Sequence, residues 1–370
     1  MLLTLSVLED NKNKLSSIEV LHGVPGEFWI GRIKRIAVYG ERGKLFLTLL
    51  IFKKREKMNI LITGATGYIG SYLTEYLSKN TFHKIIPLCR KLPDYFKEWI
   101  DIFGDVVEVD ITRLEDLKKK IPEKIDIVIH LAAFNNIDTA QMPEKALIVN
   151  GIGTRNILEI AKERKCKLFI FFSTVQVYGK KLQGIINIDS PIICEDDYSL
   201  THYVAEEYCR MYSLKYNLNI CVLRPSNIFG CPVHPKISRW NLAIPVFCLS
   251  AYKENKIMVK EGGKQMRDFV SLNFIGKSVD QLIKDNKNGF NVYNLTSENL
   301  FSILEIAETV QLLAKKILSK NIALVNKDKC ISESKRFLVR NNLSGPLKRD
   351  VVKFVLINEI KKTLRMLAEV

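Results

Sequence analysis

Met58-Asn-Ile-Leu-Ile-Thr-Gly-Ala-Thr-Gly-Tyr-Ile-Gly70 is the stretch of sequence that decides the fold. A short apolar run, Ile60 to Ile62, leads directly into Gly64, Gly67 and Gly70, and an amphipathic segment follows. Glycines at such a turn let the backbone bend sharply, let a diphosphate approach the main chain and let a helix pack closely on a strand. The N-terminus of that helix offers unpaired N–H groups to an anion. The stretch therefore predicts a strand, a dinucleotide-binding turn and the start of a helix.

After the turn, apolar strands alternate with amphipathic helices along the chain. Strands are expected at residues 84–89, 106–109, 125–131, 167–173 and 220–224, and helices at 114–121, 143–164 and 198–216. Continuous apolar runs such as Leu168-Phe-Ile-Phe-Phe172 are typical of parallel strands that are covered on both faces. The sequence therefore predicts an α/β fold with a doubly wound, Rossmann-like parallel sheet.

The pattern also divides the chain into parts. Residues 58–228 carry the alternation and are expected to form the Rossmann domain. From Phe229 onward the pattern loosens into scattered prolines and the pair Gly262-Gly263. Residues 229–370 are therefore expected to form mainly a smaller substrate-binding lobe, interleaved with the sheet. Such a lobe would lie over the carboxyl ends of the strands, where ligands of open α/β sheets bind.

Residues 1–57 precede what is normally the first strand of such a sheet. The run Lys53-Lys-Arg-Glu-Lys57 can be encoded by purines alone, as in a bacterial ribosome-binding site. We interpret Met58 as the natural start and residues 1–57 as translated upstream sequence, an N-terminal extension that is not part of the natural protein. The alternative is a genuine basic appendage with a β-hairpin around residues 40–43.

The composition is that of a globular protein. With 370 residues, of which 47% are hydrophobic and 26% charged, the chain can bury a full core. No apolar run approaches the roughly 20 residues of a membrane-spanning helix, so no membrane partner is expected. The eight cysteines include no Cys-x-x-Cys pair, so no metal site is expected, and reduced thiols favour a cytosolic location. The net charge of +16 is spread along the chain without a basic patch, which argues against a nucleic-acid partner.

Further motifs follow the glycine turn in a defined order. They are Asp110-Ile111, His130-Leu-Ala-Ala133, Asn150-Gly-Ile-Gly-Thr154, Ser173-Thr-Val-Gln-Val-Tyr-Gly179, Tyr198 with Ala205-Glu206, Leu223-Arg-Pro-Ser-Asn-Ile-Phe-Gly230 and Arg267-Asp-Phe269. Together they resemble the extended short-chain dehydrogenase/reductase group and, within it, the NAD-dependent epimerase/dehydratase family of nucleotide-sugar enzymes. The resemblance runs from about Met58 to the C-terminus. It implies a cytoplasmic oxidoreductase or isomerase that transfers hydride at a sugar carbon for the synthesis of polysaccharides or other sugar conjugates.

The resemblance also implies which residues hold the cofactor, NAD or NADP. Asp110 would accept a hydrogen bond from the adenine amino group while Ile111 packs against the ring, although Asp110 could instead cap the helix at Leu114. The other expected cofactor contacts are Gly64, Thr66, Gly67, Tyr68, Ile69, Gly70, Arg90, Leu131, Ala132, Ala133, Tyr198, His202 and Pro225. An acid after the second strand would bind the ribose 2′-hydroxyl of NAD, and a base would bind the 2′-phosphate of NADP. Arg90 and Lys91 favour NADP, whereas the family default is NAD, so both cofactors stay open.

The catalytic residues implied by the resemblance are Tyr198, Thr174 and His202. Tyr198 occupies the position of the family's proton-transferring tyrosine, and Thr174 matches the residue that aligns the substrate hydroxyl. A free tyrosine has a pKa of about 10, and relatives use a lysine four residues later to stabilise the phenolate and to hold the nicotinamide ribose. Here that position is His202, and an unperturbed imidazole is only about one-quarter protonated at pH 7.

The replacement of lysine by His202 leaves three interpretations open. The active site could be retained in a weakened or altered form. The protein could instead bind NAD(P) without turnover and have a sensing or structural role. In the third interpretation another group supplies the missing charge and the site works.

The substrate residues expected from the resemblance are Asn227 and Arg267, together with Thr174. Asn227 and Arg267 fall where relatives contact the diphosphate of a nucleotide sugar, and a guanidinium can grip phosphate with two hydrogen bonds. Arg267 could instead form an ion pair with Asp268 or another acid. Where 4,6-dehydratases carry Asp-Glu after the threonine, this chain has Val175-Gln176, so epimerisation or reduction is expected rather than dehydration. A homodimer through helices 143–164 and 198–216 is expected by analogy.

Overall fold

A computed structural model of the chain separates into two compact units, Met1–Glu56 and Lys57–Val370. The structure describes residues 57–370 except 105, 238–241, 327–336, 344 and 370. Before residue 57 it describes only the backbone of four short strands, which pair β1–β2 and β3–β4. These are β1 (Leu5–Glu9), β2 (Leu15–Val20), β3 (Gly40–Glu41) and β4 (Lys44–Leu45). We expected residues 1–57 to precede the natural start. Most of these residues lie outside the described part of the chain, so this expectation stays a prediction.

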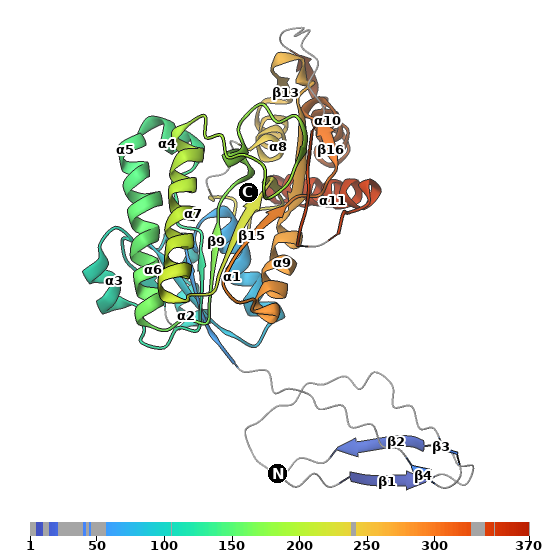
Figure 1. Cartoon of the computed structure of the whole chain (residues 1–370). Helices are drawn as coiled ribbons and strands as arrows, with labels where there is room; N and C mark the ends of the chain where they lie inside the picture. Colours follow the sequence, from blue (N-terminus) through green and yellow to red (C-terminus); the bar gives the residue numbers. More distant parts are fainter. Residues whose placement is uncertain are drawn as a thin grey trace. The chain divides into compact units, whose positions relative to one another are not determined.

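A seven-stranded sheet with the order β15-β11-β9-β8-β5-β6-β7 forms the centre of the unit Lys57–Val370 (Figure 1). Its strands are β5 (Asn59–Thr63), β6 (Lys84–Cys89), β7 (Val107–Glu108), β8 (Ile127–His130), β9 (Leu168–Phe172), β11 (Ile220–Pro225) and β15 (Phe290–Leu295). Every neighbouring pair in this sheet is parallel. The doubly wound fold predicted from the sequence is therefore confirmed. The strand order reverses between β5 and β8, and ligands of such sheets bind at the carboxyl ends of strands at this switch point.

Helices cover both faces of the sheet. One face carries α1 (Tyr68–Asn80), α2 (Trp99–Phe103) and α9 (Leu272–Asp285), and the other carries α3 (Leu114–Lys120), α6 (Thr154–Glu163) and α7 (Asp197–Tyr216). Along β5, Ile60 and Ile62 enter the first core and Leu61 enters the second, because successive side chains of a strand point to opposite faces. The continuous apolar strands are thus buried on both sides, as the sequence predicted.

The predicted helix 143–164 is formed by three consecutive elements. These are α5 (Pro143–Ala146), the π-helix η2 (Leu147–Gly153) and α6. The short helix α4 (Asn136–Gln141) precedes them. A Cβ atom at Gly153 would lie 2.6 Å from Cδ1 of Ile111, so this turn packs directly against the residue that follows Asp110.

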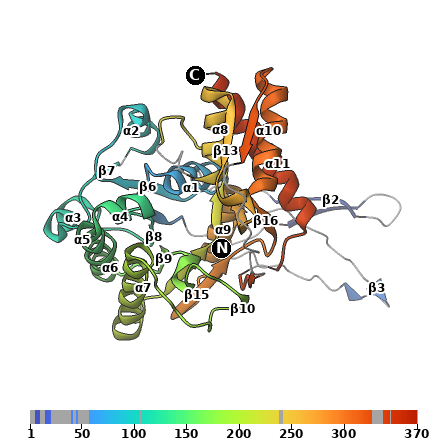
Figure 2. The same ribbon diagram turned by 90° about the horizontal axis from the view of Figure 1, so that it is seen from above.

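The remaining helices form a lobe around a third core (Figures 1 and 2). They are α8 (Ala243–Glu254), α10 (Ile303–Leu318) and α11 (Arg349–Ala368). Its strands are β12 (Asn227–Phe229), β14 (Met266–Ser271) and β16 (Leu300–Ser302) in one sheet, and β13 (Lys256–Val259) paired with β17 (Ala323–Asn326). A separate parallel pair joins β10 (Gly184–Ile186) to β18 (Phe337–Val339). Since α9 and β15 belong to the main sheet but follow β14, the lobe and the sheet are interleaved in sequence.

Candidate functional site

The glycine turn between β5 and α1 fits a bound diphosphate. Gly64 has φ +67°, and a Cβ atom there would lie 2.8 Å from the backbone nitrogen of Ala132. A Cβ atom at Gly70 would overlap the carbonyl oxygen of Gly64. Gly67 is the N-cap of α1, and the first turn of this helix has neither a side-chain cap nor an acidic residue. The positive end of α1 is therefore not compensated by a side chain, which suits an anionic group.

The residues that follow β8 lie beside this glycine turn. The backbone nitrogens of Leu131 and Ala132 donate to Oγ1 of Thr63, at 3.2 and 3.3 Å. Leu131, Ala132 and Ala133 are half-buried. The structure thus brings the glycine turn and the small residues after β8 together at the topological switch point, as expected for cofactor contacts.

Asp110 follows β7 at the same edge of the sheet. Its Oδ1 accepts hydrogen bonds from the backbone nitrogen and the hydroxyl of Thr112, at 2.9 and 2.8 Å. Burial acts to raise the pKa of Asp110, but these bonds and the charges of Arg90 and Arg113 outweigh it and lower the pKa below its usual value. The alternative role as a helix cap is not seen, because the N-cap of α3 is Arg113.

His130 is a buried centre of hydrogen bonding that the sequence analysis quoted within a motif but gave no role. Its Nδ1 lies 2.6 Å from Oγ1 of Thr63, and its Nε2 lies 3.0 Å from Oγ1 of Thr154. Thr154 donates its proton to the carbonyl of Asn150, so it accepts from Nε2–H, and Nδ1 accepts from Thr63. Burial, reinforced by the neighbouring His202, lowers the pKa of His130 to about 3. His130 is therefore a neutral imidazole, and its two hydrogen bonds tie the end of β8 to Thr63 and Thr154.

Thr174 and Tyr198 lie on elements that contact each other. Thr174 is buried, two residues after the end of β9, and is the N-cap of the short helix η3 (Val175–Tyr178). Its Oγ1 accepts a hydrogen bond from the backbone nitrogen of Gln176 at 3.2 Å, so its proton is free to point toward another acceptor. Tyr198 is half-buried in the first turn of α7, and α7 packs against η3.

His202 lies one helical turn after Tyr198, and the centroids of the two rings are 4.4 Å apart. Nδ1 of His202 lies 2.8 Å from the carbonyl oxygen of Tyr198. A carbonyl can only accept, so Nδ1 carries the proton and Nε2 of the neutral ring is an acceptor. Burial lowers the pKa of His202 to about 4, although the Tyr198 carbonyl and Asp196 act to raise it. The position at which the resemblance predicts a lysine is therefore neutral here at pH 7.

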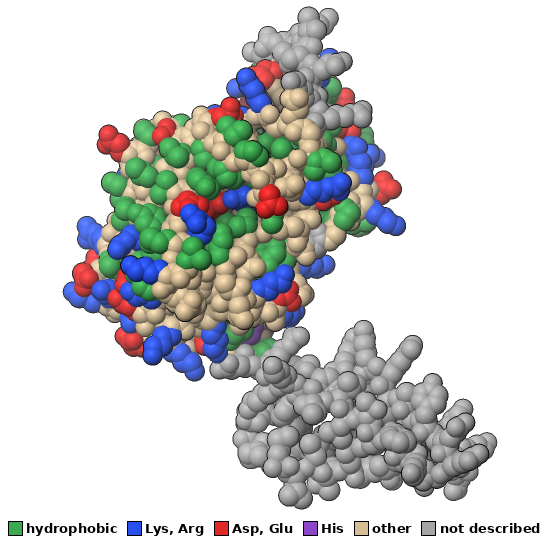
Figure 3. All heavy atoms as spheres, viewed as in Figure 1, with side chains coloured by type: hydrophobic (Ala, Val, Ile, Leu, Met, Phe, Trp, Pro, Cys, Tyr) green, Lys and Arg blue, Asp and Glu red, His purple; other side chains and the backbone are tan. Residues whose placement is uncertain are grey.

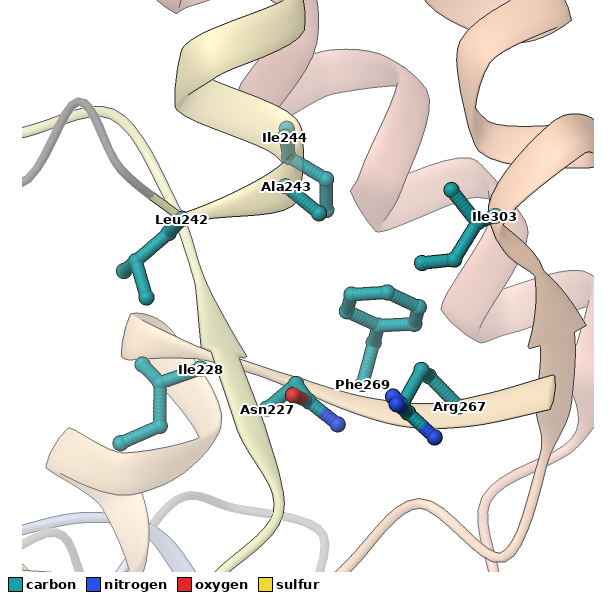
Figure 4. A pocket seen from close by; sticks show the side chains of 8 residues that line it. All are labelled: Asn227, Ile228, Leu242, Ala243, Ile244, Arg267, Phe269 and Ile303. Atoms are coloured by element: carbon teal, nitrogen blue, oxygen red, sulfur yellow. The ribbon is translucent and has the colours of Figure 1, made fainter. Parts of the chain in front are cut away.

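Asn227 and Arg267 line one cavity of about 90 Å³ in the lobe (Figure 4). The cavity is otherwise apolar; its other lining residues are Ile228, Leu242, Ala243, Ile244, Phe269 and Ile303. The two polar residues meet because β12 and β14 are paired, with Asn227 opposite Phe269. The sequence predicted both as substrate residues, and the structure brings them together.

The alternative ion pair between Arg267 and Asp268 is not formed. The buried Asp268 accepts hydrogen bonds from Ser226, Ser297 and Asn299 instead. Arg267 is exposed, its guanidinium donates to the carbonyl of Met266 at 3.3 Å, and it has no acidic partner in the described part of the chain. Its charge is available to a ligand in the cavity.

The chain matches known proteins over most of its length. The model of the "NAD dependent epimerase/dehydratase family" matches residues 60–295, a range that contains every predicted site residue. A dTDP-D-glucose 4,6-dehydratase of Dictyostelium discoideum is 30% identical over 68% of this chain, and the alignment covers only 61% of that relative. A UDP-N-acetyl-alpha-D-glucosaminuronate decarboxylase of Bacillus cytotoxicus is 30% identical over 70% of this chain and 80% of its own.

The solved structure of a UDP-glucose 4-epimerase of Thermotoga maritima has the same fold. Its TM-score is 0.70 at 20% identity, with 84% of this chain and 99% of the epimerase covered. This likeness supports the doubly wound sheet with its lobe.

Proposed function

Because this chain belongs to the NAD-dependent epimerase/dehydratase family, we propose that it is an enzyme that epimerises or reduces a nucleotide-linked sugar. Membership confirms the resemblance seen in the sequence. It also confirms the expected class of cofactor, a nicotinamide dinucleotide, since the family is NAD dependent. The nucleotide-sugar substrate, the reaction and the assignment of individual residues are part of the proposal.

The observation that carries the proposal is the convergence of Asn227 and Arg267 on one cavity of the lobe. A planar guanidinium beside an amide suits the diphosphate of a nucleotide sugar, because phosphate oxygens accept several hydrogen bonds at once. The apolar walls, with the ring of Phe269, suit the flat nucleobase. A family member that bound only the dinucleotide would have no need of this second polar site.

At the reacting sugar, a bound nicotinamide would supply the hydride chemistry, taking up and returning a hydride in an epimerisation or, in its reduced form, donating one in a reduction. Tyr198 would move the hydroxyl proton of the sugar, and Thr174 would donate a hydrogen bond that aligns this hydroxyl. Nε2 of His202 would accept a hydrogen bond from a ribose hydroxyl, since the ring has no second proton to donate. The burial of Thr174 and His202 excludes water from this part of the site.

Epimerisation or reduction is favoured over dehydration. A 4,6-dehydration must protonate and deprotonate the sugar at additional carbons, which needs acid–base side chains beside the threonine. The first residues of η3 are Val175 and Gln176, and neither side chain can exchange a proton near neutral pH. The relatives include a dehydratase, so the product of the reaction must be identified directly.

The experiment is a substrate screen with a matched set of variants. The purified protein is supplied with NAD⁺ or NADP⁺ and a panel of UDP- and dTDP-hexoses to test epimerisation, and with NADH or NADPH and the corresponding keto sugars to test reduction. Products are separated and identified by mass spectrometry and NMR. Wild-type protein should convert at least one sugar, and Tyr198→Phe should abolish the conversion while binding the cofactor normally. Conversion that survives unchanged in Tyr198→Phe would contradict the assignment of the reaction to this site.

One observation favours a second candidate function, a protein that binds NAD(P) without turnover in a sensing or structural role. The neutral and buried His202 cannot supply the positive charge that relatives place beside the tyrosine. If the wild type binds cofactor but converts no sugar, and His202→Lys gains turnover, this second function replaces the first.

We also propose that the protein is a homodimer. Exposed apolar side chains gather on the face where Figure 1 draws α5 and α7, and Figure 3 shows them from the same side. They are Leu147, Ile148 and Ile152 on η2 and Leu200, Met211 and Leu214 on α7. A second copy related by a two-fold axis would cover this face with the same residues. Light scattering should give the mass of a dimer, and the double change Leu147→Glu and Leu214→Glu should give a folded monomer.

No helix in the described ranges is both long and apolar enough to span a membrane. We also propose a cytosolic location for the protein.

A further inference from the structure

A buried ion pair between Glu206 and Arg224 lies next to the candidate catalytic residues. Both side chains are almost completely buried, with 2% and 4% of their surface exposed. The guanidinium grips the carboxylate with two hydrogen bonds, and the one from Nε to Oε1 is 3.0 Å long. The pair joins α7, which carries Glu206, to the end of β11, which carries Arg224.

The residues on either side of Thr174 are bonded to the two members of this ion pair. Ser173, directly before Thr174, donates its hydroxyl proton to Oε1 of Glu206. Tyr178, at the end of the helix that Thr174 caps, accepts a hydrogen bond of 2.7 Å from Nη1 of Arg224. Its ring also lies 4.9 Å from the guanidinium. One ion pair thus holds the backbone directly before Thr174, at Ser173, and the end of the helix that follows it, at Tyr178.

The same ion pair holds the face of α7 that carries the tyrosine. Tyr198, His202 and Glu206 are spaced four residues apart, so they lie one above another along a single side of the helix. Glu206 therefore anchors the side that presents Tyr198. The network continues to β15, because the hydroxyl of Tyr178 donates to Oδ1 of Asn294 at 2.8 Å.

Stability alone does not account for this arrangement. Two charges lose their hydration on burial, and a well-packed apolar pair is often as stabilising as a buried ion pair. What an ion pair with four directed hydrogen bonds, two within the pair and two to Ser173 and Tyr178, adds is a fixed geometry. Geometry matters beside Thr174, since a displacement of about 1 Å at a reacting group can lower a rate by about a hundredfold.

We propose that the Glu206–Arg224 pair is a positioning unit that fixes the hydroxyl of Thr174 relative to that of Tyr198, with Ser173 and Tyr178 as its two links to Thr174. The inference rests on the proposed function, because it assigns Thr174 and Tyr198 to one reaction. It concerns residues that do not themselves touch the substrate.

The test cuts one link at a time and leaves the ion pair in place. Tyr178→Phe removes the bond to Arg224, and Ser173→Ala removes the bond to Glu206. The matched control is Tyr212→Phe, because the hydroxyl of Tyr212 donates to Glu159 at 2.8 Å and ties the same helix α7 to α6 without reaching Thr174. Melting temperatures of all three variants are recorded, so that a loss of folding is recognised.

Each link variant should lower kcat by about tenfold with KM changed less than about twofold, because positioning acts in the transition state. The control should keep the kcat of the wild type. The double variant should lose less than the product of the single losses, since both links act on Thr174. A kcat that falls equally in Tyr212→Phe, or only in proportion to lost stability, would overturn the proposal.

A second readout does not depend on turnover. Tyrosine labelled with ¹³C at Cζ reports the ionisation of Tyr198 by NMR, and Tyr198→Phe assigns the signal. If Thr174 donates to the phenolate, Tyr178→Phe should raise the pKa of Tyr198 and Tyr212→Phe should leave it unchanged. Identical titrations in both variants would refute the positioning role. A wild type that converts no nucleotide sugar would refute the proposed function, while this titration would still decide the inference.

Discussion

Nδ1 of His202 donates a hydrogen bond to the carbonyl oxygen of Tyr198, and the 2.8 Å between these atoms fixes the chemistry of the histidine. The bond uses the one proton of the neutral ring. It keeps the imidazole on the helix that carries the tyrosine, and it leaves Nε2 as an acceptor. His202 can therefore accept a hydrogen bond from a hydroxyl group, but above a pH of about 4 its ring carries no positive charge.

The absence of a cation at position 202 predicts an alkaline pH profile. A phenol ordinarily gives up its proton near pH 10, and a neutral His202 does not lower this value, so kcat/KM for the sugar substrate should still be rising above about pH 8. In His202→Lys, kcat/KM should begin to rise about two pH units lower than in the wild type, because the ammonium stabilises the phenolate. The measurement is kcat/KM between about pH 6 and 10 for both proteins. A wild-type limb centred near pH 7 would mean that another group supplies the charge.

The two buried histidines predict a loss of stability in mild acid. The pKa of His130 is about 3 and that of His202 about 4 in the folded protein, both lowered mainly by burial, against about 6.5 in the unfolded chain. Below pH 6.5 the unfolded chain binds protons that the folded protein does not, so the free energy of unfolding is highest above pH 6.5 and falls toward pH 4. The slope is about 1.4 kcal/mol per pH unit for each histidine.

Urea unfolding at several pH values between about 5 and 7.5 measures this slope. His130→Asn should reduce it, even if the variant is less stable at every pH. The control is His234→Gln, because this ring is only half-buried and stacks on Tyr95; burial and Lys236 lower its pKa too, so this variant should change the slope less than His130→Asn does. An equal change of slope in both variants would show that the buried imidazoles are not its source.

Features that depend on local sequence could be predicted, and features that depend on contacts between distant segments could not. Strand Lys84–Cys89 was predicted to the residue, because a buried parallel strand needs a continuous apolar run and this one is bounded by polar residues. The π-helix η2 could not be predicted from the local pattern, which does not contain the close approach of Gly153 to Ile111, a residue far away in sequence. The local pattern of residues 143–164 indicates only a helix.

The same distinction holds at the site. Asn227 and Arg267 could be predicted because each stands in a motif, although only the pairing of β12 with β14 places them in one cavity. The protonation of His202 could not be predicted, since it depends on the burial of the ring and on the Tyr198 carbonyl. The ion pair of Glu206 with Arg224 was missed for a similar reason. Both residues were quoted in motifs, but their contact arises only when α7 packs over β11.

Arg90 predicts that the protein binds NADP⁺ more tightly than NAD⁺, through the 2′-phosphate of the adenosine ribose. It is exposed directly after β6, without an ion pair among the described residues. The acids nearby are engaged elsewhere: Glu108 accepts from the backbone nitrogen of Leu92 at 2.8 Å, and Asp110 accepts from Thr112. A 2′-phosphate would gain a charge-assisted hydrogen bond from Arg90, worth about tenfold in affinity.

Calorimetric titration with NAD⁺ and NADP⁺ measures this preference without any substrate. Arg90→Asp should weaken the binding of NADP⁺ by at least about tenfold and change that of NAD⁺ by less than about threefold. Lys97→Ala is the control, because Lys97 pairs with Asp94 at 3.1 Å on the surface. Equal losses for both cofactors would show that Arg90 contacts another part of the dinucleotide.

The cavity in the lobe predicts that Arg267 binds the diphosphate of the substrate. Arg267→Met keeps much of the apolar stem but removes the charge, so the affinity for UDP or dTDP should fall by about thirtyfold, the effect of a charge-assisted hydrogen bond of about 2 kcal/mol. Binding of the wild type should weaken as salt rises, and that of the variant much less, since a screened charge is lost. Arg340→Met is the matched control, because Arg340 is an exposed arginine that pairs with Glu298 away from the cavity. This binding is measured without cofactor and without turnover. If Arg267→Met binds UDP or dTDP as tightly as the wild type does, the diphosphate does not bind in this cavity, and the proposed substrate class loses its main support.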